Sequence, residues 1–535
     1  MDDQKTRPIF IALLLFTGIL IGLLINKGEK RHPAVNPSDD FSKFDEVMWH
    51  IGEDYVDEIN DDDLQDRAIE ALMEDLDPHS QYVTLKEFNA INDPLLGSFE
   101  GIGVQFRIEK DTVAIVSVIK GGPSEKVGIM AGDRIIYVDD TLVAGVNLKN
   151  DDVMRMLKGR KGTKVKVEML RRGVEGLMPF TITRDVIPTY SVDIAYMLDD
   201  ETGYLKLSKF SATTHDEFKK GIRKLKDQGM KRLIFDLRGN TGGYLTAAVE
   251  VADEFLPKGS LIVYTEGRNR SRQYMNARRR GMVEDIPVAV LIDGESASAS
   301  EIVAGALQDN DRGTIVGRRS FGKGLVQEQI ILSDNSAIRL TVARYYTPTG
   351  RSIQKPFDGD RERYLFESYE RYENGEVFSE DSIHFADSLK YTTPKGKTVY
   401  GGGGIMPDVY VPLVDDSTEY YFNRIANLGL LYQYAFEYSD THRKELEKFK
   451  TVEAFQKSFR VTDAMFDELV KLADEKGIKG SEKEKQVARR EADILLKAYI
   501  ARDIFDDEGF YPIYAPMDNM LQKALEVMKE EPQYK

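Results

Sequence analysis

The chain has 535 residues, of which 41% are hydrophobic, and a formal net charge of −17 at pH 7. This length exceeds one ordinary core and predicts roughly three or four domains. The acidic balance argues against nucleic acid as a partner, and the absence of cysteine excludes disulfides, thiol nucleophiles, cysteine-bound zinc and lipid attachment through cysteine.

An uncharged apolar segment, Pro8 to Ile25, lies near the amino end between basic residues. Its length nearly matches the roughly 30 Å hydrocarbon layer of a bilayer. A cleaved signal peptide is the alternative, but such peptides have a shorter apolar core and a small-residue cleavage site. We therefore predict a short leader and transmembrane anchor at residues 1–27, a single pass through the inner (cytoplasmic) membrane, and export of the large body that follows to the periplasm or cell exterior.

Residues 28–96 are predicted to contain a linker and an N-terminal helical region. Prolines and charges interrupt regular structure at the start of this segment. From Phe41 to Leu76 apolar residues recur at helical intervals, which predicts two helices joined around Asn60 to Asp63. The sequence Leu76-Asp77-Pro78-His79-Ser80 ends the second helix.

Three further regions differ in their hydrophobic pattern. Residues 97–185 contain short strands with glycine turns and one helix, which predicts a small, mostly β domain. In residues 186–415 strands and helices alternate, which is typical of an α/β layer architecture. Within it, residues 357–396 are polar and without period, and we expect an insertion or mobile loop. Residues 416–535 are charged and helical, and we expect an accessory region.

A glycine-rich turn, Asp236-Leu237-Arg238-Gly239-Asn240-Thr241-Gly242-Gly243, follows a predicted strand and precedes a predicted helix. Glycines let backbone N–H groups turn toward a ligand at a helix N-terminus. The turn matches neither a dinucleotide-binding fingerprint nor a P-loop. It is either a structural turn or, beside a nucleophile, a source of an oxyanion donor.

Two other segments contain candidates for a nucleophile and its base. Serines 296, 298 and 300 open a helical pattern, and their spacing alone does not choose among them. Lys323 lies between two glycines. A lysine base must be neutral near pH 7, so it must be buried, which lowers its pKa. Gln327 is placed to orient its amine. The alternative is a purely structural role, in which the serines cap a helix or pack closely and the lysine lies on the surface.

Histidine-based chemistry has little support in this sequence. The six histidines lie at positions 32, 50, 79, 215, 384 and 442, outside the glycine-rich segments. No pair has the spacing of a zinc site, and cysteine is absent. We therefore predict neither a metal nor a cofactor.

Several segments together resemble the bacterial carboxyl-terminal processing peptidases, also called tail-specific proteases. They occur in the family's order over roughly residues 40–415. The matching segments are Leu76 to Ser80, Asp236 to Gly243, Ser296 to Ile302, Gly322 to Gln327, Tyr346 to Gln354 and Gly403 to Asp408. One position departs from the family, which commonly has Asn-x-Gly where this chain has Asp293-Gly294-Glu295.

The resemblance implies a fold and a set of catalytic residues. The fold is a crotonase/ClpP-like α/β core (residues 186–415) with an inserted PDZ domain (residues 97–185). The nucleophile falls on Ser298, the base on Lys323, and the residue that holds the lysine amine on Gln327. The oxyanion donors fall on the N–H of Ala299 and on one from Gly242 or Gly243.

The small β domain then resembles a PDZ domain. Gly101-Ile102-Gly103-Val104 matches its carboxylate-binding loop, where successive N–H groups form a nest for a terminal carboxylate. The next strand pairs with an extended peptide. Side-chain pocket candidates are Val104, Phe106, Val153 and Leu157. The alternative is that these side chains fill the domain core.

The resemblance implies a membrane-anchored serine endopeptidase that cleaves exported proteins or peptides recognised by a free, apolar C-terminus. Substrate binding to the PDZ domain is expected to complete the Ser–Lys pair. The alternatives are a PDZ scaffold with an inactive protease core, and a crotonase-type acyl-CoA enzyme. The expected partners are substrates with free C-termini, the membrane and a second copy of the chain.

Overall fold

A computed structural model of the chain describes residues 42–414 and 420–530. It divides into two compact units, Met1–Ala71 and Leu72–Lys535. The described part of the first unit contains helix α2 (Lys43–Asp54) and most of helix α3 (Asp61–Leu76), as the periodicity predicts. Ser42 and Asp45 cap the start of α2 by reciprocal side-chain hydrogen bonds. The predicted anchor lies outside the described residues, and no helix within them is long and apolar enough to cross a bilayer.

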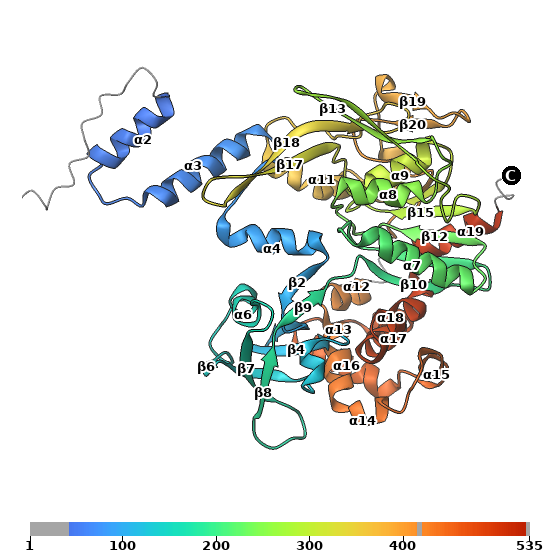
Figure 1. The fold of residues 1–535 in the computed structure, drawn as a ribbon. Coiled ribbons are helices and arrows are strands. Elements are labelled where there is room, and N and C mark those ends of the chain that lie inside the picture. Colours follow the sequence, from blue (N-terminus) through green and yellow to red (C-terminus); the bar gives the residue numbers. More distant parts are fainter. Residues whose placement is uncertain (1–41, 415–419, 531–535) are drawn as a thin grey trace, which may run out of the picture. The chain divides into compact units, whose positions relative to one another are not determined.

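The β domain is built on one antiparallel sheet in the order β3-β4-β5-β7-β8, with β6 beside β5 (Figure 1). Its elements are β3 (Val104–Glu109), β4 (Thr112–Val118), α5 (Pro123–Lys126), β5 (Arg134–Val138), β6 (Thr141–Leu142), α6 (Asn150–Leu157), β7 (Lys164–Leu170) and β8 (Met178–Thr183). Alternate residues of β7, such as Val165 and Val167, are fully buried, which explains the period-two pattern. Two antiparallel strands, β2 (Ser98–Gly101) and β9 (Asp185–Pro188), lead into and out of the domain.

The catalytic core contains a six-stranded sheet in the order β10-β11-β12-β15-β16-β21, parallel except for β10. The strands are β10 (Val192–Met197), β11 (Thr202–Leu207), β12 (Arg232–Asp236), β15 (Val288–Ile292), β16 (Thr314–Gly317) and β21 (Val409–Tyr410). Leu233 and Phe235 pack on one face of this sheet and Ile234 on the other. Burial on both faces explains the continuous apolar runs of these strands.

Different helices cover the two faces of this sheet. The first face packs against α7 (Thr214–Asp227), α8 (Leu245–Asp253) and α9 (Ala299–Asp309). The second face packs against α19 (Asn519–Glu530), whose Met520, Leu521 and Ala524 are buried on Ile234 and Leu291. The last helix of the accessory region at 416–535 is therefore part of the catalytic core, because it closes an otherwise open apolar face.

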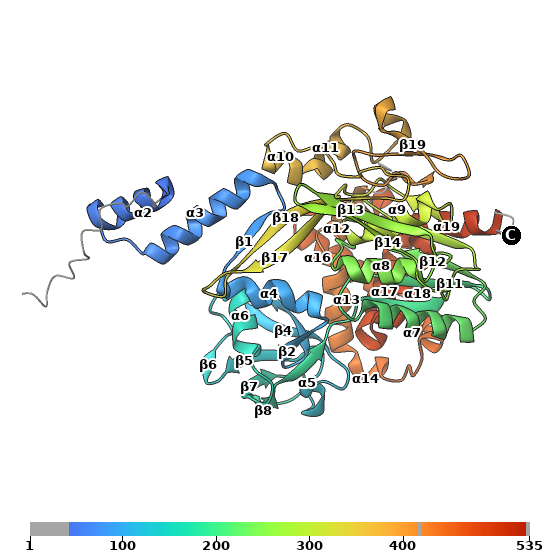
Figure 2. The same cartoon turned by 45° about the horizontal axis from the view of Figure 1, so that its top comes forward.

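A second sheet contains strand β17, which follows directly after Lys323 and Gly324. β18 (Ala337–Tyr346) pairs with β1 (Gln81–Val83), β13 (Leu261–Gly267) and β17 (Leu325–Ile331), and β13 also pairs with β14 (Arg270–Asn276). Figure 2 shows β1, β17 and β18 side by side. The strand β1 thus joins the segment after α3 to the lysine-bearing sheet. Helix α4 (Leu85–Leu96) follows β1 and leads to β2.

The polar stretch at 357–396, which we expected to be an insertion or mobile loop, contains short helices and a strand. It folds into α10 (Arg361–Leu365), α11 (Glu367–Glu373), η1 (Glu380–Ser382), η2 (Asp387–Leu389) and β19 (Lys390–Thr392), which pairs with β20 (Thr398–Tyr400). Buried Arg371 donates to the carbonyl of Ser320 at 2.9 Å, and Arg319 binds Glu376. These ion pairs and backbone contacts order a segment that lacks hydrophobic period.

Residues 420–514 form a separate helical layer, here called the helical unit. Its helices are α12 (Tyr420–Asn427), α13 (Leu430–Thr441), α14 (Arg443–Leu446), α15 (Val452–Ser458), α16 (Asp463–Glu475), α17 (Glu482–Phe505) and α18 (Asp507–Tyr514). They share one apolar core around Phe455, Leu469 and Leu496. The helical character predicted from the sequence is confirmed for this region.

Candidate active site

Ser298 lies in the turn between β15 and α9, immediately before the helix begins. Its backbone is left-handed, with φ 55° and ψ −111°, a region that a residue with a side chain rarely adopts. Strain of this kind persists where the surrounding structure holds it, often at functional sites. The sharp strand-to-helix turn presents the serine at a helix N-terminus, much as a nucleophile elbow does.

The neighbouring serines have structural roles that separate them from Ser298. Ser296 and Ser300 are fully buried. The Ser296 hydroxyl donates to the carbonyl of Leu237 at 2.9 Å, and that of Ser300 to the carbonyl of Asn240 at 2.8 Å. Both therefore tie the serine turn to the glycine-rich turn. Ser298 Oγ makes no hydrogen bond to another described side chain and lines a cavity.

Lys323 lies just before β17, and its ammonium nitrogen donates to Gln327 Oε1 at 2.9 Å. Burial lowers the pKa of Lys323 below its ordinary value, and the nearby charge of Arg339 lowers it further. A lowered pKa increases the fraction of neutral amine at physiological pH, which a base requires. The predicted pairing of Lys323 with Gln327 is present in the structure.

The orientation of the Gln327 amide depends on the turn after α3. Gln327 Nε2 donates to the carbonyl of His79, so Oε1 is left to face Lys323. The Asp77 carboxylate shapes that turn by accepting from the N–H groups of His79 and Ser80 at 2.8 Å each. Sequence reasoning missed this link, although the turn was recognised as a family segment.

Glu301 is a buried carboxylate beneath the two candidate catalytic residues, and sequence reasoning did not find it. Its oxygens accept from the N–H groups of Ser298, Gly322 and Lys323 at 2.8, 2.7 and 2.9 Å, and from the Ser320 hydroxyl at 2.5 Å. Burial raises the pKa of Glu301 to about 7, although these four donors favour the charged form. Glu301 is the third residue after the N-cap Ser298, which is the usual position for a glutamate that pairs with an N-cap. This spacing is the sequence signal that could have identified Glu301.

Two backbone N–H groups without an acceptor in the described part of the chain belong to residues that line the cavity beside Ser298. Ala299 is the first residue of α9, and Gly243 follows the glycine-rich turn; both line the same cavity as Ser298. Neither N–H donates to another described residue. The N–H of Gly242 is already bound by Asn240 Oδ1 at 2.9 Å. Of the two predicted candidates in this turn, the Gly243 N–H is therefore the one without a hydrogen-bond acceptor among the described residues.

Gly242 has a different role, which is close packing. A Cβ built at Gly242 would lie 2.9 Å from Ser298 Cβ and 3.0 Å from Ala299 N. Any side chain there would displace the serine turn. Asp293 secures the other side of that turn, because its Oδ1 accepts from Gly239 N and Ser296 N at 3.1 Å each. The departure from the family at Asp293-Gly294-Glu295 therefore still forms a hydrogen-bonded turn.

The cavity beside the two turns has a volume of about 540 Å³. Ser298, Lys323 and Gln327 line it together with Gly243 and Ala299. The tertiary structure thus brings the predicted catalytic residues to one cavity. Among the described residues no hydrogen bond joins Ser298 Oγ to Lys323 Nζ. No group of three or more metal-ligating side chains is found in the same part of the chain.

An ion-pair network supports the glycine-rich turn from behind. Arg238 binds Asp236 through Nε and Nη2, and it binds Asp518 at 2.8 and 2.6 Å. Asp236 also accepts from the Tyr204 hydroxyl at 2.6 Å. Burial acts to raise the pKa of Asp236, but the charges of Arg238 and Lys206 and the hydrogen bonds from Arg238 and Tyr204 together hold that pKa well below the ordinary value. Asp518, which precedes α19, therefore helps to hold the turn that carries Gly243.

The predicted peptide-binding residues divide into two groups. Gly101, Ile102, Gly103 and Val104 form the loop into β3, and the N–H groups of Ile102 and Gly103 donate to no described residue. Val104 and Phe106 are half-buried on the edge strand. Val153 and Leu157 of α6 are 1% and 4% exposed within the domain core. Their burial favours the alternative interpretation, in which these two side chains fill the core of the domain.

Comparisons with known proteins show which families and proteins this chain is similar to. Residues 201–362 match the model for peptidase family S41, residues 101–177 that for the PDZ domain, and residues 421–506 that for a family of unknown function (DUF8443). A carboxy-terminal-processing protease of Bartonella bacilliformis is 37% identical over 60% of this chain and 74% of its own length. The carboxy-terminal processing protease CtpA of Bacillus subtilis is 37% identical over 59% and 67%. A solved photosystem II D1 C-terminal processing protease is 26% identical, with a TM-score of 0.37 over 70% of this chain and 87% of its own.

Proposed function

Because the chain belongs to the carboxy-terminal processing proteases of peptidase family S41, we propose that Ser298 is its nucleophile and Lys323 its general base. The peptidase carries a PDZ domain and an α/β catalytic core. The observation that carries the assignment is the shared cavity, where Ser298 and a buried lysine meet two unused backbone donors.

The reaction is a two-step acyl transfer. Neutral Lys323 removes the Ser298 proton as Oγ attacks the scissile carbonyl, and the resulting ammonium then protonates the leaving amine. The N–H groups of Ala299 and Gly243 stabilise the oxyanion, and one good donor lowers the barrier by about 2.7–4 kcal/mol. Lys323 then activates a water molecule, which attacks the acyl-enzyme and regenerates Ser298.

Hydrogen bonding around Lys323 fits this cycle. Gln327 Oε1 accepts a hydrogen bond from the Lys323 amine. The lone pair of the Lys323 nitrogen therefore stays free to turn toward Ser298 Oγ and take its proton. A carboxylate at position 327 would instead favour the ammonium form. Glu301 fixes the backbone of both partners and does not touch the reacting atoms.

A direct test replaces each catalytic residue in turn. Ser298→Ala and Lys323→Ala are each expected to abolish cleavage of a peptide with an apolar C-terminus, while the thermal unfolding transition remains. Ser271→Ala removes a hydroxyl at an exposed position of β14 outside the cavity and is the control for a serine-to-alanine change. Retention of full cleavage by either of the first two variants would refute the Ser–Lys assignment.

Recognition of the substrate tail is assigned to the edge of the PDZ domain. The free N–H groups of Ile102 and Gly103 provide a nest for a terminal carboxylate, and β3 offers an edge to an extended peptide. Amidation of the peptide C-terminus removes that carboxylate. It should weaken both binding and cleavage; equal cleavage of acid and amide would refute this mode.

The amino-terminal segment supports a proposal about location. The apolar run from Pro8 to Ile25 is long enough for one membrane crossing, and we assign it to an anchor in the inner (cytoplasmic) membrane with the protease exported. Fractionation of cells that produce the full chain, followed by protease digestion of intact spheroplasts, tests both statements. Recovery in the soluble cytosolic fraction would contradict them.

A further inference from the structure

The helical unit contacts the PDZ domain through one face of α13 and the start of α14. Arg107 of β3 lies over the rings of Phe436 and Tyr432, at 4.2 and 5.0 Å from their centroids. Val104 and Phe106, on the opposite face of the same strand, pack on the PDZ core. The strand expected to pair with a substrate tail is therefore held from its outer face by the helical unit.

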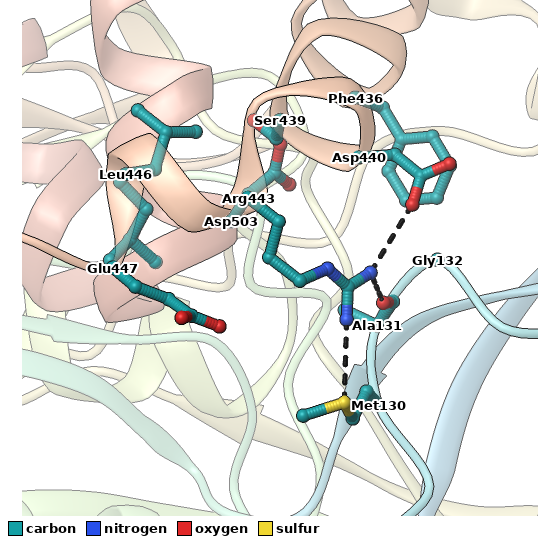
Figure 3. A pocket seen from close by; sticks show the side chains of 11 residues that line it. Met130, Ala131, Gly132, Phe436, Ser439, Asp440, Arg443, Leu446, Glu447 and Asp503 are labelled. Atoms are coloured by element: carbon teal, nitrogen blue, oxygen red, sulfur yellow. Dashed lines mark hydrogen bonds and ion pairs between the residues drawn. The ribbon is translucent and has the colours of Figure 1, made fainter. Parts of the chain in front are cut away.

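Charged contacts surround this aromatic contact. Arg443 donates to the carbonyl of Ala131 in the β4–β5 connection and to Asp440 at 3.2 Å, as Figure 3 shows. Asp440 also accepts from Arg134 of the PDZ domain at 3.4 Å. The β4–β5 connection lies close to the helical unit at Gly132. A Cβ atom built at Gly132 would lie 2.5 Å from both Arg443 Nη2 and Asp440 Oδ1.

The interface is packed less completely than a domain core. A cavity of about 220 Å³ lies between the β4–β5 connection and α13, α14 and α17 (Figure 3). Buried Arg107 Nε and Asp503 Oδ2 have no hydrogen-bond partner among the described residues. Burial raises the pKa of Asp503 to about 6, and the charge of Arg107 from across the interface acts against that rise. Voids and unmatched polar atoms are typical of surfaces that can separate, as interdomain interfaces do.

Other links between the PDZ domain and the catalytic core are narrow. The chain enters and leaves the domain through the paired strands β2 and β9. On that side Lys158 binds Asp93 of α4 at 3.1 Å. A two-stranded connection of this kind permits rotation, so the position of the domain depends on what else it contacts.

We propose that the helical unit is an intramolecular dock for the PDZ domain. Arg107 of the PDZ domain and Arg443 of the helical unit each make a contact that holds the two together. Docking sets the position of a bound substrate tail relative to Ser298, so that the enzyme cuts at a fixed distance from the C-terminus. The docking of the PDZ domain is independent of the proposed function, whereas the fixed cut position rests on it. This assigns a role to the region that matches a family of unknown function.

The docking statement is tested by distance measurements on the full chain. The chain has no native cysteine, so Glu175→Cys in the PDZ domain and Lys457→Cys on α15 provide two exposed spin-label sites. The Ser298→Ala background prevents self-cleavage during the measurement. The parent is expected to give one narrow distance distribution, whereas Arg107→Glu and Arg443→Glu should each broaden it.

The control is Arg160→Glu, which makes the same charge change at an exposed PDZ residue outside the interface. It should keep the narrow distribution. The two test substitutions lie in different domains, so unfolding of one domain cannot explain a shared result, and thermal unfolding of each variant checks this. A broad distribution in the parent, or a narrow one in both Arg107→Glu and Arg443→Glu, would overturn the dock.

The cut-position statement is tested with the active enzyme and a long peptide with an apolar C-terminus. Mass spectrometry is expected to find one main cut for the parent and for Arg160→Glu, and several neighbouring cuts for Arg107→Glu and Arg443→Glu. An unchanged single cut in both variants would refute it. Failure of the Ser–Lys assignment would appear separately, as cleavage by Ser298→Ala, and would leave the distance result intact.

Discussion

The backbone N–H groups of Ser298 and Lys323 donate to the same carboxylate oxygen, Oε2 of Glu301, at 2.8 and 2.9 Å. One side chain therefore fixes the distance between the serine turn and the lysine segment. The second oxygen of Glu301 extends this to Ser320 and Gly322. The cavity geometry depends on a buried carboxylate that does not itself react.

Glu301→Gln is expected to lower kcat by about two orders of magnitude with a smaller effect on KM, because displacement of a catalytic group by about 1 Å costs this much. All four partners of Glu301 donate hydrogen bonds to it, so the NH₂ group of a glutamine at this position would face other donors. Leaving a buried partner unsatisfied costs about 1–3 kcal/mol of unfolding free energy. Steady-state kinetics and denaturant unfolding measure both effects. The exposed Glu295→Gln is the control, and equal kinetics of the two variants would contradict the bridging role.

The pH dependence of cleavage should follow the ionisation of Lys323. Burial lowers its pKa below 10.5, and only the neutral amine is a base, so kcat/KM should rise with pH through that lowered pKa and then level off. A profile of kcat/KM against pH measures it. Activity that falls with pH over the same range would contradict a lysine base.

Lys323→Met should be inactive but more stable than the parent at neutral pH. The folded state binds the Lys323 proton less tightly than the unfolded state does, so the unfolded chain holds more protons between the lowered pKa and 10.5. The stability of the parent should therefore rise with pH across that window, and the advantage of Lys323→Met should shrink. Denaturant unfolding at several pH values tests this, with exposed Lys226→Met as the control.

Gln327→Glu should shift the pH profile of kcat/KM upward. A carboxylate beside Lys323 stabilises the ammonium and raises its pKa, so more alkaline solution is needed to form the base. The variant also loses the bond from Nε2 to His79, which should lower the plateau. Gln273→Glu, at an exposed position of β14, is the control. An unshifted profile with normal activity would show that Gln327 does not act on the amine.

Asp518→Asn should reduce kcat and the unfolding free energy, although residue 518 lies far along the chain from the catalytic segments. The substitution leaves Arg238 with one carboxylate partner, Asp236, and loosens the turn that carries Gly243. Loss of a hydrogen bond to a charged group costs about 1.5–3 kcal/mol. Glu526→Gln, exposed on α19, makes the same chemical change outside the network. Matching behaviour of the two variants would separate the C-terminal segment from the active site.

Local patterns in the sequence were sufficient to predict the helices and strands and to identify the type of reaction. Period-two and period-3.6 patterns predicted β7 and α7, because each of these elements buries one face or one stripe of its own residues. The continuous apolar run of β12 predicted a strand that is buried on both faces. The segments around Ser298 and Lys323 identified the family, because strained turns and close backbone approach restrict which residues fit there.

Contacts between distant segments were decided by the tertiary structure alone. The preference for Gly243 over Gly242 depends on the hydrogen bond that the Gly242 N–H donates to Asn240 Oδ1, and the burial of Val153 depends on packing inside the PDZ core. Glu301 joins Ser298 to Lys323, and Asp518 reaches Arg238, only after the chain folds. Periodic patterns and motifs describe residues that are close to one another along the chain. The partners of buried charges are close in space but far apart in the sequence, so no local pattern identifies them.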